Sequence, residues 1–149
     1  MNILPLFFIL NLILSQDHWE TAIYSSDEWS YHIPSEELLE DWKYTEFNDN
    51  NWQVGNGGFG YGDGDDGTII DPTLSIYLRK TFTIEDLGRL SGSILHTDYD
   101  DGFVAYLNGI EIARSSNLGS QGDFVSYDSG TNDQDHEAQL YQGEHPEYI

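Results

Sequence analysis

The sequence predicts an all-β protein, and the arrangement that it favours is an antiparallel β-sandwich. Aromatic residues make up 14% of the 149 residues, and such residues favour strands. Short runs with alternating apolar residues recur along the chain, with Gly, Asn and Asp turn signals between them. Almost no stretch has helical periodicity. Together these observations are typical of a sandwich built from short strands.

The first residues predict a secretory signal peptide over residues 1–15. The run "MNILPLFFILNLILSQ" is apolar and ends at the small residue Ser15. It is short for a membrane span of about 20 residues, so we expect no membrane insertion after cleavage. It carries no Lys or Arg, which leaves a buried first strand or an uncleaved anchor as alternatives. We therefore expect a secreted or cell-surface protein, and without cysteine it has no disulfides.

Residues 16–40 are mixed and acidic, and they lead into the predicted sandwich. The stretch "SEELLEDW", residues 35–42, predicts a short helical turn with Ser35 as its cap. The stretch "DWKYTEF", residues 41–47, alternates and predicts a strand with Trp42 and Tyr44 on one face.

The middle of the chain predicts further strands. "SIYLRKTFTI", residues 75–84, alternates, and Lys80 interrupts its apolar face, as residues at a strand end or a bulge do. "LSGSILHTDY", residues 90–99, predicts a weaker strand. The clearest element is a hairpin, because Asn108-Gly109 separates the apolar runs 103–107 and 110–113, and a two-residue type I′ turn needs positive φ at both positions.

From Ser115 onward the chain predicts loops with one possible strand, "FVSY", residues 124–127. No closing strand follows before Ile149. A sandwich that stops after a long loop leaves an edge unpaired, so we expect the chain to be a fragment of a longer protein.

The stretch "GYGDGDDG", residues 60–67, raises the possibility of a metal site. A phosphate-binding P-loop is excluded because no Lys lies between Lys43 and Lys80, and an EF-hand is excluded by the spacing of its acids. What remains is a glycine-permitted loop with three carboxylates. Together with an acid of the "DYDDG" loop, these oxygens suit a structural calcium ion. The candidate ligands are Asp63, Asp65, Asp66 and Asp101. The alternative is that both loops are solvated turns.

Charge and motifs exclude several function classes. The formal net charge of −22 argues against nucleic acid and anionic membranes, which bind through Lys and Arg. Thiol chemistry is excluded, and no paired His metal motif or G-x-S-x-G nucleophile motif is present. We therefore expect no catalysis by this chain, although a glycoside hydrolase needs only two suitably spaced acids and is kept as a less favoured alternative.

Aromatic side chains are the remaining candidates for ligand binding, because their ring faces stack on sugar rings. The predicted contacts are Trp52, Tyr61 and Tyr99, and Trp29 and Trp42 are further candidates. The alternative for each is packing within the protein.

The segment "DYDDGFVAYLNGIEIARS" resembles the galactose-binding-like jelly-roll module of secreted bacterial proteins. It is most similar to the version that precedes spore-coat protein H (CotH) kinase-like domains. The stretches "WKYTEFNDNNWQVGNGGFGYGDGDDGT", "SIYLRKTFTI" and "DHEAQLYQGEHPEYI" match in the same order. The resemblance implies a jelly roll over residues 41–149 that lacks its last strand, with Phe47, Trp52 and Arg79 as structural framework.

The resemblance implies a non-catalytic module of a larger secreted protein that binds a carbohydrate or a surface polymer, and structural calcium is common in such modules. The alternative is a structural or interaction domain that positions a downstream kinase-like domain of the same polypeptide without binding sugar. Neither the glycan nor the oligomeric state follows from the sequence, because one fold carries many ligands.

Overall fold

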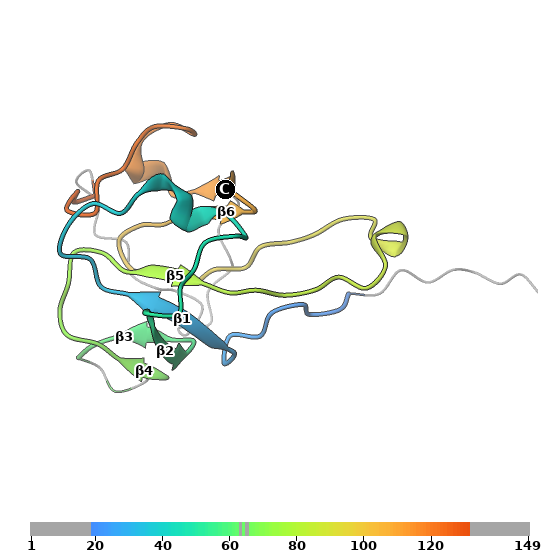
Figure 1. The fold of residues 1–149 in the computed structure, drawn as a ribbon, viewed down its shortest axis with the longest axis horizontal. Helices are drawn as coiled ribbons and strands as arrows, with labels where there is room; N and C mark the ends of the chain where they lie inside the picture. The colour runs from blue at the N-terminus through green and yellow to red at the C-terminus, as the bar shows by residue number, and fades with distance from the viewer. Residues whose placement is uncertain (1–18, 63, 65, 132–149) are drawn as a thin grey trace, which may run out of the picture.

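The structure, a computed structural model, describes residues 19–62, 64 and 66–131. It consists of a body of short strands and a long arm that projects from the body, as Figure 1 shows. Among the described residues there is no α-helix, only the 3-10 helices η1 (Glu40–Lys43), η2 (Leu87–Arg89) and η3 (Ser116–Leu118). The predicted all-β class is therefore confirmed.

The largest sheet of the body has three antiparallel strands in the order β2-β1-β5. The central strand β1 (Glu28–His32) pairs with β2 (Gln53–Asn56) on one side and with β5 (Tyr77–Arg79) on the other. Two residues each of β3 (Phe59–Gly60) and β4 (Thr68–Ile69) form a small parallel pair beside it.

The predicted hairpin is present as β6 (Val104–Leu107) and β7 (Ile110–Arg114), which form an antiparallel pair. Leu107 pairs with Ile110, so the turn contains only Asn108 and Gly109. Both turn residues have positive φ, 51° and 84°, as a type I′ turn requires. The two residues of the turn therefore set the register as far as the Tyr106–Glu111 pair, and an irregularity shifts the pairing beyond it, where Ala105 pairs with Ala113.

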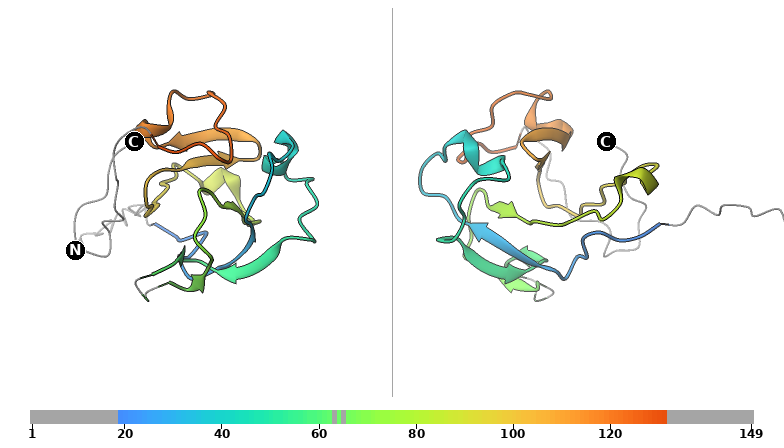
Figure 2. Two further views of the ribbon diagram at one scale, coloured as in Figure 1. Left: turned by 90° about the vertical axis from the view of Figure 1, so that its left-hand side faces the viewer. Right: turned by 45° about the vertical axis from the view of Figure 1, so that its right-hand side comes forward.

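The hairpin and the three-stranded sheet lie on opposite sides of the body and are linked through η1 (Figure 2). The Trp42 ring meets the Tyr77 ring of β5 edge-on at 4.8 Å and the Tyr106 ring of β6 edge-on at 5.6 Å. Offset and edge-on ring pairs of this kind are favourable by about 0.5–1.5 kcal/mol each beyond the area that they bury. One indole thus connects the sheet and the hairpin.

The expected strand over residues 41–47 is wrong, because its first residues form η1. The Arg79 guanidinium donates hydrogen bonds to the main-chain carbonyls of Trp42 and Tyr44. Those carbonyls therefore bond to a side chain and not to a neighbouring strand. The expected cap is wrong as well, since η1 begins at Glu40 and not after Ser35.

Three further expected strands are shortened or missing. The strand expected over residues 75–84 is β5 alone, which ends at Arg79 immediately before the interrupting Lys80. Residues 90–99 and 124–127 form no strand. A strand needs a neighbour to pair with, and the described residues offer none at these places. Conversely, β1 lies in the segment 16–40, where the sequence showed no strand pattern.

A well-buried ion pair lies on β7. Arg114, only 7% exposed, donates to both carboxylate oxygens of Glu111 at 2.9 and 3.0 Å. Its other donors reach the carbonyls of Leu118 and Asp123, both at 2.7 Å. Hydrogen bonds from this guanidinium lower the pKa of Glu111. The pair thereby fixes the loop after the hairpin to the hairpin itself.

Apolar burial is sparse in comparison. None of the described apolar side chains is fully buried. Ring contacts hold much of the body together, among them the pairs Tyr31–Phe59 at 5.2 Å and Phe47–Trp52 at 5.6 Å.

Some predictions lie outside the described residues. These are the signal peptide over residues 1–15 and the "DHEAQLYQGEHPEYI" segment with the end of the chain. Within the described part, no helix has the length and apolar character needed to cross a membrane.

Candidate binding site

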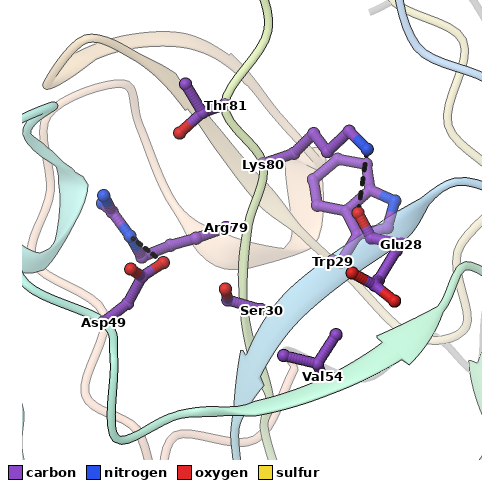
Figure 3. Close-up of a pocket in the computed structure, with 8 residues that line it drawn as sticks. All are labelled: Glu28, Trp29, Ser30, Asp49, Val54, Arg79, Lys80 and Thr81. Carbon is purple, nitrogen blue, oxygen red and sulfur yellow. Dashed lines mark hydrogen bonds and ion pairs between the residues drawn. The ribbon is translucent and has the colours of Figure 1, made fainter.

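A pocket of about 250 Å³ opens on the body where β1, β2 and β5 meet, and Figure 3 shows its lining. It is lined by Glu28, Trp29, Ser30, Asp49, Val54, Arg79, Lys80 and Thr81. Three strands and the segment before β2 contribute to it, so the pairing of the sheet creates the site.

The chain of β5 passes between two basic side chains, which lie on either side of it in Figure 3. Arg79 pairs through Nε with the Asp49 carboxylate at 3.2 Å. Its guanidinium also lies 5.1 Å from the centre of the Phe47 ring, a cation–π distance. With its Nη1 donating to carbonyls of the η1 segment, Arg79 is held in one position.

Lys80 forms the other basic side of the pocket. Its Nζ lies 3.4 Å from the Asp27 carboxylate and donates to the Glu28 carbonyl at 2.9 Å. Both basic groups of the pocket are thus compensated by acids of the protein. An uncharged ligand with hydroxyl groups fits this balance better than an ion does.

Trp29 provides the apolar surface of the site. It pairs across the sheet with Gly55, and Thr68 and Phe59 pack beside that glycine. The loop beside it is tight, because a methyl group on Gly57 would collide with the carbonyl of Ser25 and lie 3.5 Å from Trp29 Nε1. Glycine at position 57 therefore lets the loop pass close to the half-exposed indole.

The three aromatic residues predicted as ligand contacts are found in three different environments. Trp52 stacks on His32 at 5.4 Å and also contacts Phe47. Tyr61 follows β3 and is exposed. Tyr99 packs on Phe103 at 4.7 Å. None of the three lines the pocket.

The predicted calcium ligands are only partly described. Asp63 and Asp65 lie outside the described residues. Asp66 is half-buried, and its carboxylate rests against Gly60, where an added methyl group would collide with it. Glycine at position 60 thus makes room for the Asp66 carboxylate.

The fourth predicted ligand, Asp101, belongs to the other end of the body. It has a φ of 63°, and its carbonyl accepts a hydrogen bond from the Asn117 side chain. The β3–β4 pair and the β6–β7 hairpin lie on opposite sides of the body in Figure 2. Within the described ranges, no three His, Asp or Glu side chains are grouped to hold a metal ion.

Sequence reasoning did not select the pocket residues Asp49, Arg79 and Lys80 as ligand contacts. A signal was available, because the chain has only five Lys and Arg residues and two of them are adjacent at positions 79 and 80. The pairing of these cations with acids far away in sequence is a property of the folded chain alone.

Comparisons of the chain with protein-family models, with curated proteins and with solved structures give no match. The local geometry of the pocket therefore carries the functional argument.

Proposed function

We propose that this chain is a non-catalytic module that binds carbohydrate, as part of a protein that acts outside the cell or on its surface. The observation that carries the proposal is the pocket on the three-stranded sheet. There the Trp29 indole lies with Lys80 and Glu28 on one side of the β5 chain, the Asp49–Arg79 pair lies on the other side, and Ser30 and Thr81 complete the polar lining (Figure 3). An aromatic face next to fixed donors and acceptors is the combination that suits a sugar ring.

The size of the pocket limits the ligand. About 250 Å³ lies just below the range of roughly 300–1,000 Å³ typical of small-molecule sites. We propose a single sugar ring or the end of a glycan chain as the occupant. Because the basic side chains are already paired with acids, a neutral sugar is favoured over a phosphorylated one.

We propose further that the body is a galactose-binding-like jelly roll of the kind found ahead of CotH kinase-like domains. In this proposal β1 belongs to the jelly roll, although it precedes residues 41–149. The link through Trp42 between the sheet and the hairpin supports a two-layer arrangement. Export through the signal peptide at residues 1–15 and a structural calcium ion in the β3–β4 loop belong to the same proposal.

The pocket is tested by titrating the full chain with neutral monosaccharides and soluble polysaccharides in a calorimeter. We expect binding that Trp29→Ala weakens at least tenfold, a loss of about 1.4 kcal/mol. Trp29→Phe should retain most of the affinity, because it keeps an aromatic face. Trp19→Ala is the matched control, since Trp19 is 74% exposed and lies outside the pocket.

Two results would contradict the proposal. One is that no carbohydrate binds. The other is binding that survives unchanged in a folded Trp29→Ala variant, which would place the sugar elsewhere.

A second candidate is an interaction domain that positions a downstream kinase-like domain. The exposed apolar side chains favour it, among them Leu39, Ile69 and Leu74. Co-purification of this module with such a domain, in the absence of sugar binding, would support this candidate over the first.

A further inference from the structure

The arm is the most unusual feature of the molecule, and apart from Thr81 at its base it plays no part in the pocket. We define it as residues 81–97, which run out from the body and return to it, with η2 at the tip (Figure 1). Every residue from 81 to 96 is exposed.

Exposed apolar side chains are concentrated on this arm. Six large ones have exposed fractions between 36% and 70%. They are Phe82, Ile84, Leu87, Leu90, Ile94 and Leu95. Apolar residues gathered on an exposed surface typically mark an interaction site.

The backbone of the arm is also available for pairing. No described strand pairs with residues 81–97. Main-chain hydrogen bonds within this stretch lie at the tip, where the N–H of Arg89 donates to the Asp86 carbonyl and the N–H of Leu90 donates to the Leu87 carbonyl. Unpaired extended backbone is a template for the addition of a strand from another chain.

The distribution of charge indicates what the arm pairs with. The chain carries 27 acidic and 5 basic residues. The arm, residues 81–97, has one basic residue (Arg89) and two acidic ones (Glu85, Asp86), for a net charge of only −1. A basic partner would therefore gain little at the arm compared with the strongly acidic body.

Two copies of this chain would repel each other strongly if their acidic bodies met. The arm projects away from the body and has almost no net charge (Figure 1). Arms can therefore meet while the two bodies stay apart. This arrangement favours a second copy as the partner.

We propose that the arm is a dimerisation element, in which the arms of two copies pair along their extended edges and cover one another's apolar side chains. Such a contact uses the same surface on both copies and closes with twofold symmetry. It goes beyond the proposed sugar binding and does not depend on it.

The oligomeric state of the full chain is the first test, measured by sedimentation over a range of concentrations at low and high salt. We expect a concentration-dependent dimer that becomes tighter as salt rises, because salt screens the repulsion between the acidic bodies. A monomer under all conditions would overturn the proposal. A dimer that weakens with salt would also count against it.

The absence of cysteine allows a direct test of the contact. Single-cysteine variants Ile84→Cys, Leu90→Cys and Ile94→Cys can form a disulfide only between two copies. We expect at least one of them to cross-link under mild oxidation far faster than Ile69→Cys, a control on β4 that is 75% exposed. Equal rates at all four positions would mean random collision and would overturn the proposal.

Negative charges introduced on the arm test whether the contact can be disrupted. Leu90→Glu with Ile94→Glu should shift the dimer to monomer, and Ile69→Glu should not. Both arm residues are exposed in the single chain, so these changes leave its folding intact. A double variant that still dimerises would place the contact elsewhere.

Discussion

At the scale of single residues, the Glu111–Arg114 pair is the best-buried ion pair of the described structure. The two side chains are only 9% and 4% exposed, so water screens their attraction little. The Glu111 carboxylate also accepts a hydrogen bond from the Gly122 main-chain N–H at 3.0 Å. The remaining donors of Arg114 are used by two carbonyls of the following loop. Removing either partner would leave the other buried and uncompensated.

Glu111→Gln should therefore lower the free energy of unfolding by about 3 kcal/mol, near the low end for a broken buried pair. Chemical denaturation at neutral pH measures this. Glu46→Gln, at an exposed acid, is the control and should change stability by less than about 0.5 kcal/mol. Equal effects of the two changes would show that the pair contributes little.

The same pair predicts a dependence on pH. Because the pKa of Glu111 is lowered in the folded state, the folded protein binds this proton less readily than the unfolded chain does. The stabilisation of the folded state by ionised Glu111 is fully present above the pKa of about 4.3 that a glutamate has in the unfolded chain. It is lost as pH falls through the lower pKa of Glu111 in the folded state. The acid-induced loss of stability should thus be smaller in Glu111→Gln than in the unchanged protein.

At the scale of elements, the β6–β7 hairpin depends on Gly109 for two reasons. Its φ of 84° is strained for residues with a side chain, and an added methyl group would collide with the Tyr44 ring. The turn thus places Tyr44 against the hairpin, immediately after η1. One glycine serves both the turn and the contact between η1 and the hairpin.

Gly109→Ala should lower stability by more than Gly122→Ala does. Gly122 has nearly the same φ, 88°, but open space around it, so it isolates the cost of the backbone conformation, about 1–2 kcal/mol. The additional loss at Gly109 should shrink when Tyr44 is replaced by Ala. Thermal unfolding of Gly109→Ala, Gly122→Ala, Tyr44→Ala and the double variant Gly109→Ala with Tyr44→Ala measures these losses of stability. Equal losses at the two glycines would show that the Tyr44 contact is unimportant.

At the scale of the whole molecule, acidic charge is the dominant property. With a formal net charge of −22 and no fully buried apolar side chain among the described residues, the folded state gains from anything that neutralises acids or covers apolar surface. A cation in the β3–β4 loop would neutralise acids. Pairing of the arms would cover apolar surface.

If calcium binds in the β3–β4 loop, millimolar Ca²⁺ should raise the melting temperature relative to excess chelator. An ion at about 100 times its Kd stabilises the folded state by about 2.7 kcal/mol. Asp66→Asn should reduce the rise, and Asp71→Asn, at an exposed acid beyond β4, should not. Equal melting temperatures with calcium and with chelator would mean that the loop is a solvated turn. General screening would produce the same rise with Mg²⁺ and in the Asp66→Asn variant.

The strand class and the hairpin followed from the sequence because their causes are local. Asn108-Gly109 permits positive φ wherever it occurs, and alternation of apolar residues over a few positions favours a strand. The end of β5 at Arg79 also has a local signal, because the charged Lys80 interrupts the apolar face of the strand at the next position. These features need no knowledge of what lies beside them.

The tertiary structure alone decided which alternating segments became strands and which residues met. Residues 41–47 alternate, yet Arg79 from β5 takes their carbonyls, and β1 forms without a clear pattern because two strands flank it. The pocket likewise joins Trp29 and Asp49 to Arg79, residues far apart in the chain. Local geometry is encoded in neighbouring residues, whereas pairing depends on which distant segments are free to bond, and no short stretch of sequence contains that information.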